Sequence, residues 1–174
     1  MDQAFTMLLT GLSGAGKSTI AVALAEKLRL AGKRVQVLDG DLVRNEIGHL
    51  FGYSREERLK VSQILRFSAK VLNRNGISVI IAAISPYQEM RDLYRRDVEH
   101  YIEVYVKCPL EVCIARDVKG LYKRALDGIE KNVIGIDEAF EIPKSPDVVV
   151  DTSILDDTAT LENIWSFLEN RQYV

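Results

Sequence analysis

A glycine-rich stretch near the N-terminus carries the clearest chemistry in this sequence. It runs from Gly11 to Thr19 and matches the pattern G-x-x-x-x-G-K-[ST] in full. Its glycines let backbone N–H groups turn inward around an anion, Lys17 adds a positive charge, and the Ser18 hydroxyl can ligate Mg²⁺. A helix that begins here would point the positive end of its dipole at the anion. The stretch therefore predicts that a nucleoside triphosphate is bound by Gly11, Ser13, Gly14, Ala15, Gly16, Lys17, Ser18 and Thr19.

Two carboxylates stand at the end of the next predicted strand, where one glycine separates Asp39 from Asp41. Ligands of parallel sheets bind at the carboxyl ends of the strands. One carboxylate could help to hold Mg²⁺ through water, and the other could accept a proton from an attacking hydroxyl. The sequence does not decide which carboxylate holds the metal and which accepts the proton. The pair could instead be a solvated acidic turn or an N-cap for a helix at 42–46.

A serine and several basic residues are predicted near the same edge of the sheet. Ser85 follows the third predicted strand, and its hydroxyl could contact a bound acceptor or cap the helix that follows Pro86. Phosphoryl transfer needs positive charge over the transferring group and around an anionic acceptor. The basic residues that could supply this charge are Arg44, Arg58, Lys119, Lys123 and Arg124. Any one alone could be a solvated surface charge, but together they indicate a kinase with an anionic acceptor.

Other nucleotide-dependent proteins fit the sequence less well. A GTPase would need an Asn-Lys-x-Asp motif to read its base, and the chain has none. AAA-type and helicase ATPases need further modules that 174 residues cannot hold. A non-catalytic nucleotide-binding domain is the alternative from another class, but such a domain has no use for an acceptor base such as Asp39 or Asp41. The residues favour transfer to a hydroxyl.

The order of the predicted elements indicates how these residues come together. Short β-branched apolar runs predict strands at 5–9, 34–38, 77–84, 101–106 and 147–150. Helical periodicity predicts helices at 17–31, 55–75, 110–116 and 157–170, with a capping box at Ser54 and Glu57 and a stop at Gly32. Strands and helices alternate, which predicts an α/β fold: a three-layer, doubly wound parallel sheet of the P-loop NTPase type, similar to the nucleotide kinases.

One long segment interrupts this alternation. Residues 117–146 contain three glycines, two prolines and charges of both signs. A connection of this length inside a compact domain is usually functional, often a lid over a site, although a plain surface excursion is the alternative. We therefore expect a single P-loop kinase domain over 1–174 with a lid at about 117–146.

Composition and charge narrow the class of protein further. The chain has 47% hydrophobic and 28% charged residues, which is ordinary for a globular protein. Its net charge of −2 argues against a nucleic-acid or membrane surface, and no apolar run is long enough to span a bilayer. Two cysteines and two histidines are too few for a disulfide framework or a zinc site. The N-terminus has no basic region typical of a signal peptide, so we expect a cytoplasmic protein.

Several short motifs, taken together, resemble the adenylylsulfate kinase (APS kinase) family. The matching stretches are 11–19, 38–44, 52–58, 84–87, 109–113, 116–123, 135–141 and 151–152. Each is common alone, but the set covers nearly the whole chain in order with little or no gapping. The resemblance implies the P-loop kinase fold and transfer of the γ-phosphoryl group of ATP to the 3′-hydroxyl of adenylyl sulfate. The product would be PAPS, used in sulfate assimilation or sulfation.

The resemblance also implies roles for individual residues. It assigns ATP to the stretch 11–19 and Mg²⁺ to Ser18 and Asp39. The implied catalytic residues are Lys17, Asp39, Asp41 and Ser85, of which Ser85 is an acceptor ligand because in-line transfer needs no phosphoryl carrier. The implied acceptor-binding residues are Asp39, Asp41, Arg44, Tyr53, Arg58, Ile84, Ser85, Lys119 and Val133. Enzymes of this family are often dimers, so a homodimer stays open.

The acceptor half departs from the pattern of the family. Where the family usually reads Glu-Asn-Ile-Arg-Arg, residues 60–64 read Lys-Val-Ser-Gln-Ile, so Val61 replaces the Asn and both arginines are lost. In the predicted lid, Val133 replaces the Phe that stacks on the acceptor's adenine, and Leu126 replaces an arginine. Tyr53 keeps the aromatic partner of that Phe. The alternative acceptor is therefore a hydroxyl of another small anionic nucleotide conjugate or metabolite.

Overall fold

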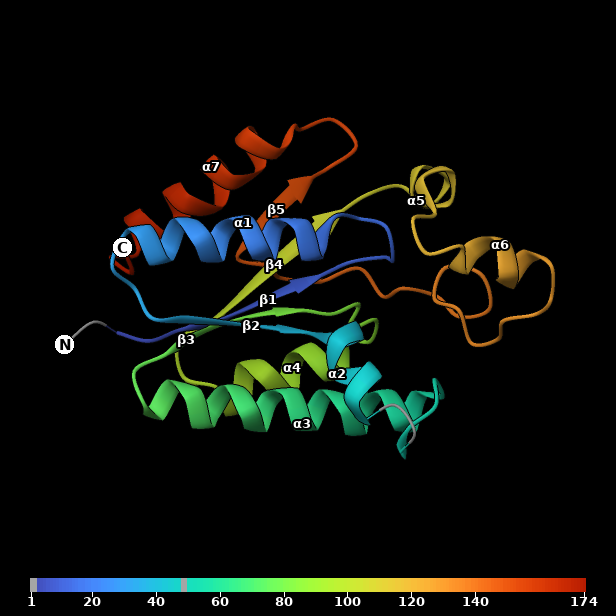
Figure 1. Cartoon of the computed structure of the whole chain (residues 1–174), viewed down its shortest axis with the longest axis horizontal. Helices are drawn as coiled ribbons and strands as arrows, with labels where there is room; N and C mark the ends of the chain where they lie inside the picture. Colours follow the sequence, from blue (N-terminus) through green and yellow to red (C-terminus); the bar gives the residue numbers. More distant parts are fainter. Residues whose placement is uncertain (1–2, 48–49) are drawn as a thin grey trace.

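The computed structural model describes residues 3–47 and 50–174, which form a five-stranded parallel sheet flanked by helices (Figure 1). The strand order is β2-β3-β1-β4-β5. The strands are β1 (Thr6–Thr10), β2 (Val35–Asp39), β3 (Ser78–Ala82), β4 (Tyr101–Lys107) and β5 (Val148–Asp151). The helices are α1 (Lys17–Leu30), α2 (Gly40–Ile47), α3 (Arg55–Arg74), α4 (Gln88–Asp97), α5 (Leu110–Arg116), α6 (Leu121–Leu126) and α7 (Asp157–Asn170).

The helices cover both faces of the sheet. α1 and α7 lie on one face, and α2, α3 and α4 lie on the other (Figure 1). The central strand β1 is buried along its whole length: Met7 and Leu9 pack in the core with α1, while Leu8 packs with Val61 and Leu65 of α3. A strand that is apolar on both faces needs a helical layer on each side. The predicted three-layer, doubly wound α/β fold is confirmed.

The helix after the glycine-rich loop ends where its sequence predicts. The N–H of Gly32 donates to the carbonyl of Arg29 at 2.9 Å, and the N–H of Lys33 donates to the carbonyl of Leu28 at 3.0 Å. This pair of hydrogen bonds is a Schellman motif, which needs a residue in the left-handed region. Gly32 adopts φ 80°, which glycine does without steric cost, and so fixes where α1 stops.

The start of α3 is fixed by the predicted capping box. The Ser54 hydroxyl accepts from the Glu57 N–H at 3.3 Å, and the Glu57 carboxylate accepts from the Ser54 N–H at 3.1 Å. The same carboxylate accepts from the Ser54 hydroxyl at 2.7 Å and from the Gly52 N–H at 2.8 Å. These hydrogen bonds, that of the Ser54 hydroxyl foremost, lower the pKa of Glu57 to about 2. They also hold the short loop that carries Tyr53.

We predict that Glu57→Gln destabilises the protein at neutral pH and that the effect fades in acid. Because the pKa of Glu57 falls from 4.5 to about 2 on folding, its carboxylate stabilises the native state fully above pH 4.5, and this contribution is lost as the pH falls toward 2. Loss of a cap of this kind lowers the Tm at pH 7 by about 2–4 °C. Thermal melts followed by circular dichroism between pH 7 and pH 3 measure the difference. Glu56→Gln, on the exposed side of the same turn, is the control, and a Tm difference for Glu57→Gln that does not shrink below pH 4.5 would contradict the prediction.

The predicted element boundaries are close to those in the structure. Each strand boundary differs from its predicted range by at most two residues; β3 ends at Ala82 rather than at residue 84, because the ladder with β2 ends there. The helices α5 and α7 match their predicted ranges, α1 and α3 end one residue early, and α6 has no counterpart among the predictions. Across residues 3–47 and 50–174, no helix is both long enough and apolar enough to cross a membrane.

The segment 117–146 projects beyond the carboxyl ends of the strands (Figure 1). It contains α6 and an isolated bridge between Ile134 and Glu138, and is otherwise irregular. Hydrogen bonds tie it to the body of the protein: the Tyr122 hydroxyl donates to the carbonyl of Ser13 at 2.9 Å, and the Glu141 N–H donates to the carbonyl of Pro86 at 2.9 Å. Its role as a lid stays a prediction.

Candidate active site

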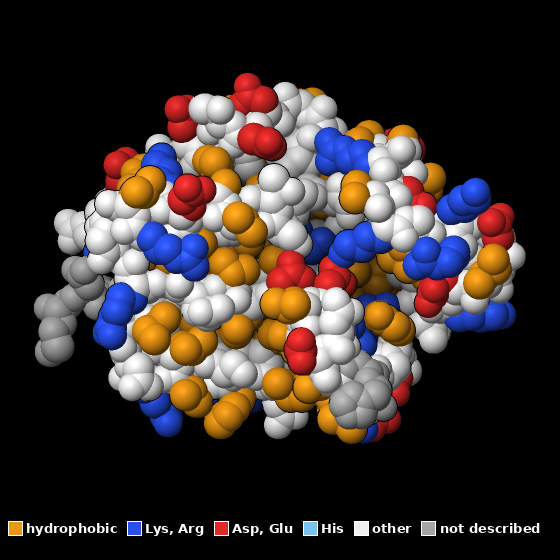
Figure 2. All heavy atoms as spheres, in the orientation of Figure 1, with side chains coloured by type: hydrophobic (Ala, Val, Ile, Leu, Met, Phe, Trp, Pro, Cys, Tyr) orange, Lys and Arg blue, Asp and Glu red, His pale blue; other side chains and the backbone are white. Residues whose placement is uncertain are grey.

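A cavity of about 460 Å³ opens at the carboxyl end of the sheet, where ligands of doubly wound sheets bind. Its walls come from the loop before α1, the start of α2, the first half of α3, the turn after β3 and the 117–146 segment. Near the middle of the face in Figure 2, acidic and basic side chains meet beside this hollow. The predicted site residues that line it are Ser13, Gly14, Gly16, Lys17, Ser18, Thr19, Asp41, Arg44, Tyr53, Arg58, Ile84, Ser85, Lys119, Arg124 and Val133.

Two of the eight residues predicted to bind the nucleotide do not line the cavity. A Cβ on Gly11 would lie 2.3 Å from the carbonyl oxygen of Val106, so only glycine lets the loop pass this close to β4. Ala15 is buried; its N–H donates to the carbonyl of Leu12 at 3.2 Å, and its carbonyl accepts from the Thr152 hydroxyl at 2.9 Å. Gly11 and Ala15 therefore shape the loop from behind.

Lys17 lies inside the loop with its ammonium group bonded to the loop itself. Its side chain is buried, and its Nζ donates to the carbonyl of Leu12 at 2.7 Å. Burial lowers the pKa of Lys17 from 10.5 to about 8, although the nearby Asp41 and Asp39 act in the opposite direction. A buried cation whose acceptor is a neutral carbonyl gains strongly from an anion, so this group is suited to a phosphate.

The side-chain oxygens of Ser18 and Asp39 lie side by side next to the loop. The Ser18 hydroxyl donates to Asp39 Oδ2 at 2.5 Å. The other oxygen, Oδ1, accepts from the N–H of Asp41 at 2.8 Å, so Asp39 also caps the start of α2. The helix-cap alternative thus holds for Asp39 alongside its place beside Ser18. Hydroxyl and carboxylate oxygens are the donors that Mg²⁺ prefers, and it usually completes its shell with water and phosphate.

Other metal chemistry has less support. Among the described residues, no three His, Cys, Asp or Glu side chains come together as a metal site. One of the two histidines, His49, lies outside the described residues. Cys108 and Cys113 are buried free thiols, and burial raises the pKa of Cys113 to about 12, which keeps it from reacting as a thiolate.

Asp41 lies on the other side of the acidic turn from the Ser18 pair, toward the 117–146 segment. Its carboxylate is about two-thirds exposed and pairs with the ammonium group of Lys119. Lys119 thus reaches across the mouth of the cavity from the loop before α6. The structure separates the two carboxylates, because Asp39 accepts from the Ser18 hydroxyl whereas Asp41 lines the cavity and pairs with Lys119.

Arg44 and Arg58 flank the ring of Tyr53. Their guanidinium carbons lie 4.3 Å and 5.4 Å from the ring centroid. Arg44 donates to the carbonyl of Gly52 at 2.7 Å, and Arg58 donates to the carbonyls of Tyr53 at 2.9 Å and Asn132 at 2.7 Å. Burial lowers the pKa of both guanidinium groups below 12.5, which leaves them charged at neutral pH. These acceptors are neutral carbonyls, so both charges can still attract an anionic ligand.

Ile84 and Ser85 form a strained turn after β3. Ser85 is buried and adopts φ 44°, a left-handed conformation that is uncommon for a residue with a side chain. The helix α4 begins only after Tyr87, which is its N-cap and makes no side-chain cap hydrogen bond. The alternative that Ser85 caps this helix is therefore wrong, because the N-cap position belongs to Tyr87, two residues later.

The wall of the cavity is apolar where the chain departs from the resembled family. Val61 and Val133 both line it and are 5% and 4% exposed. Leu65 and Met90 extend the same wall. Leu126, at the position of a family arginine, is 62% exposed and lies outside the lining of the cavity. At Val61 and Leu126, this side of the site therefore lacks the polar side chains that the resembled family has there.

Three residues for which the sequence predicts no role support the loop before α1. Arg116 donates to the carbonyls of Gly14 at 3.3 Å and Thr152 at 2.7 Å, and the hydroxyls of Thr152 and Tyr122 donate to this loop as described above. Thr152 follows the last strand, so the rule that singled out the acidic pair could have found it. Arg116 and Tyr122 carry no such signal, because they lie in the helices α5 and α6 and not at the end of a strand.

The comparisons with known proteins agree with one another. Residues 3–151 match the model of the family described as adenylylsulphate kinase. An adenylyl-sulfate kinase of Rippkaea orientalis is 44% identical over 173 residues, covering 99% of this chain and 96% of the relative. A probable adenylyl-sulfate kinase of Pyrococcus abyssi is 46% identical over 151 residues, covering 87% of each.

A solved structure is similar over nearly the whole chain as well. The APS kinase of Mycobacterium tuberculosis in complex with AMPPNP and APS superposes with a TM-score of 0.92 at 33% identity, covering 97% of this chain and 99% of that one. The residues matched by the family model, 3–151, include all five strands and the 117–146 segment. The chain therefore belongs to the adenylylsulphate kinase family, and it is a kinase.

Proposed function

We propose that this chain transfers the γ-phosphoryl group of ATP to the 3′-hydroxyl of adenylyl sulfate. The observation that carries the proposal is a single cavity with two chemically different ends and a carboxylate between them. One end is the phosphate-binding loop with the buried Lys17, and the other has Arg44 and Arg58 around the ring of Tyr53. An adenine ring suits the aromatic and apolar wall, and an anionic phosphosulfate suits the two guanidinium groups.

In the proposed reaction the 3′-oxygen forms a bond to the γ-phosphorus while the bond from that phosphorus to the β,γ-bridging oxygen breaks. ADP leaves, and the acceptor gains a 3′-phosphate. Asp41 takes the proton of the attacking hydroxyl, which requires that it exchange the Lys119 ammonium for that hydroxyl. Lys17 exchanges its bond to the Leu12 carbonyl for one to the transferring phosphate and stabilises the charge that develops there.

We also propose that Mg²⁺ is held by Ser18 directly and by Asp39 through water. The two side-chain oxygens lie 2.5 Å apart at the start of α1 and next to the phosphate-binding loop, so the donor set fits the ion. When bound, Mg²⁺ neutralises charge on the β- and γ-phosphates.

ADP release from ATP and Mg²⁺ by the purified protein, with and without adenylyl sulfate, tests the proposal. Strong stimulation at micromolar adenylyl sulfate, with one 3′-phosphorylated product per ADP, is the expected result. ATP binding without stimulation would show that the acceptor is wrong. Stimulation by no alcohol at all would favour a non-catalytic nucleotide-binding domain.

A second candidate acceptor is another small anionic nucleotide conjugate or metabolite with a free hydroxyl. The observation that favours it is the apolar wall at Val61 and Val133, where the family usually has an Asn and a Phe. This wall gives an adenine one aromatic face, at Tyr53, rather than two. A screen of nucleotide conjugates for stimulated ADP release separates this candidate from adenylyl sulfate.

We predict that Val133→Phe lowers the KM for adenylyl sulfate. A second aromatic face over the adenine adds base stacking of about 1–3 kcal/mol, of which the lower end corresponds to about a fivefold lower KM. Val133→Leu adds volume without a ring and is the matched control, for which we expect no gain. Steady-state kinetics at saturating ATP measure both variants. An unchanged or higher KM for Val133→Phe would show that position 133 does not face the adenine.

The remaining expectations are proposals that rest on the same site. We propose one kinase domain over 1–174 whose 117–146 segment closes over the bound substrates, since it supplies Lys119 and Val133 to the cavity. We propose a cytoplasmic location, which suits two buried free thiols, and a homodimer. Light scattering coupled to gel filtration, with and without ATP, tests the assembly.

A further inference from the structure

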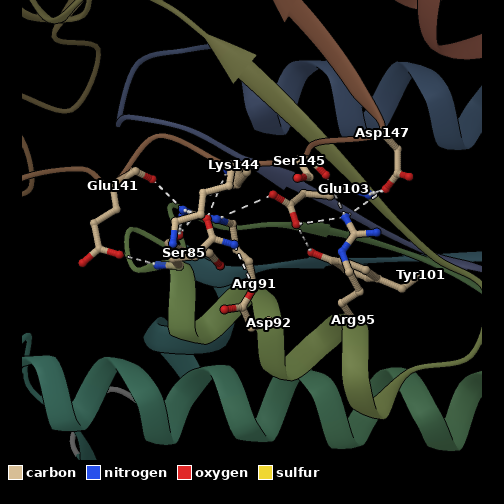
Figure 3. Close-up of polar contacts among 12 residues, drawn as sticks. Ser85, Arg91, Asp92, Arg95, Tyr101, Glu103, Glu141, Lys144, Ser145 and Asp147 are labelled. Atoms are coloured by element: carbon tan, nitrogen blue, oxygen red, sulfur yellow. Dashed lines mark hydrogen bonds and ion pairs between the residues drawn. The ribbon is translucent and has the colours of Figure 1, made fainter.

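Arg91 of α4 is, among the described residues, the largest side chain that is fully buried. It lies below the turn after β3, between β4 and the end of the 117–146 segment (Figure 3). No step of the proposed reaction uses it, and it is absent from the lining of the cavity. A buried guanidinium group outside the site needs a physical reason to be there.

The guanidinium group joins segments that are far apart in the sequence. Its Nη1 donates to the carbonyl of Ser85 at 2.7 Å, and its Nη2 donates to the carbonyl of Glu141 at 2.6 Å and to Gln88 Oε1 at 3.0 Å. Its Nε lies 3.6 Å from a carboxylate oxygen of Glu103, a buried residue of β4. Two different nitrogens of one rigid, planar group therefore hold the carbonyls of two different segments, whereas the donors of a lysine ammonium group share one nitrogen on a flexible stem.

The first of these segments is the strained turn at the acceptor end of the cavity. The Thr10 hydroxyl donates to the carbonyl of Ile84 at 2.6 Å, and Arg91 donates to the carbonyl of Ser85. The peptide groups on both sides of Ser85 are thus held by side chains, which maintains its unfavourable φ of 44°. Without one of these two hydrogen bonds, the turn would relax and move Ser85 from its place in the cavity wall.

The second segment is the return of the 117–146 segment to the sheet. Glu141 donates its N–H to the carbonyl of Pro86 at 2.9 Å, and its side chain accepts from the Gln88 N–H at 2.6 Å. Lys144 donates its N–H to Gln88 Oε1 at 3.2 Å. Arg91 donates to both Glu141 and Gln88, so it locks this return segment onto the same turn that carries Ser85.

Stability alone does not account for this arrangement. Glu103 is 2% exposed; desolvation raises its pKa, and its pairing with Arg91 and Arg95 only partly counters this effect. Buried ion pairs are often no more stable than apolar residues of similar volume, because desolvation cancels most of the attraction. What the guanidinium group does provide is geometry: by donating to the carbonyls of two segments, it fixes the position of one segment relative to the other.

We propose that Arg91, with Glu103 as its counter-charge, is a positioning residue for the acceptor side of the active site. It holds the Ser85 turn and the return of the 117–146 segment in register without contacting either substrate. The kinetic test of this inference rests on the proposed function, whereas its hydrogen-exchange test rests on the structure alone.

Steady-state kinetics of Arg91→Lys provide the first test. We expect the KM for adenylyl sulfate to rise about tenfold or more, because two hydrogen bonds from a charged donor are lost, while the KM for ATP changes less than about twofold. Arg95→Lys is the matched control: Arg95 also pairs with Glu103 at 3.4 Å, one helical turn further on, but bonds Asp147 and Ser145 instead of Ser85 and Glu141. Equal losses for both substrates, or an unchanged acceptor KM, would overturn the proposal.

Hydrogen exchange provides the second test, which does not depend on the acceptor. In Arg91→Lys the amides of Gln88 and Glu141 are expected to exchange at least about tenfold faster than in the wild type, while those of β1 keep their rates. Unchanged exchange at both amides overturns the proposal even if the wild type does not use adenylyl sulfate. If Arg91→Lys does not fold, Glu103→Gln is tested instead, because it keeps the shape of the side chain and removes the counter-charge. A rise in the KM for the acceptor alone, smaller than that expected for Arg91→Lys, supports the proposal. A KM for the acceptor that does not rise, or that rises together with the KM for ATP, overturns it.

Discussion

Replacing Lys17 with alanine is expected to lower kcat by about 1,000-fold. A preorganised donor at the site of developing charge contributes about 10²–10³ in rate, and Lys17 brings a full charge in a buried position. The measurement is ADP release at saturating ATP and acceptor, together with nucleotide affinity by calorimetry. We expect affinity to fall far less than kcat, since the backbone of the loop still binds the phosphates.

Thermal stability separates this effect from unfolding. Burial lowers the pKa of Lys17 from 10.5 to about 8, so at pH 7 its charged form is less favourable in the folded state than in the unfolded state. Lys17→Ala should therefore keep or raise the Tm of the ligand-free protein while activity is lost. Lys27→Ala, on the same helix but stacked over Trp165, is the control and should retain kcat within about twofold. Unchanged turnover in Lys17→Ala would rule out the role given to this lysine.

Asp41→Asn is expected to lower kcat by about 10²–10⁴ while ATP affinity and the Mg²⁺ requirement stay the same. The reason is geometric: Asp41 faces the cavity and Lys119, whereas Asp39 bonds the Ser18 hydroxyl at 2.5 Å. An amide of the same shape cannot accept the proton of the acceptor hydroxyl. Single-turnover assays with preformed enzyme–ATP–Mg²⁺ complex measure the chemical step directly.

The matched variant is Asp39→Asn, which should act through the metal instead. We expect the Mg²⁺ concentration for half-maximal rate to rise about tenfold, with kcat partly restored at high Mg²⁺. If Asp39→Asn shows no shift in Mg²⁺ dependence and Asp41→Asn does, the two roles are exchanged. If neither variant loses more than a few-fold in rate, neither carboxylate acts as the base.

Local patterns were sufficient to predict most of the fold and most of the residues around the cavity. The stretch 11–19 and the pair Asp39–Asp41 are short motifs whose meaning depends on a strand before them and a helix after them. Gly32 and the Ser54–Glu57 box end and start helices through hydrogen bonds within a few residues. Each of these signals involves residues that are close together in the sequence, so it can be recognised without knowledge of the folded structure.

What the sequence could not predict depends on contacts between distant segments. The division between Asp39 and Asp41 became visible only through the distance to Ser18, 21 positions away. The strained φ of Ser85 and the burial of Arg91 depend on carbonyls and strands that no local pattern places. In sequence, Arg91 is one arginine of a polar helix, and only its contacts distinguish it from its neighbour Arg95.

The hydrogen bonds behind the phosphate-binding loop bear on the order in which the protein folds. Arg116, Tyr122 and Thr152 reach Gly14, Ser13 and Ala15 across 102, 109 and 137 positions of the chain. Closing loops of this length carries an entropic cost that slows their formation, whereas α1 can form locally. During refolding, we therefore expect the glycine motif to acquire its backbone geometry only when the last third of the chain has docked. Nucleotide binding should then arise late, even though the motif lies near the N-terminus.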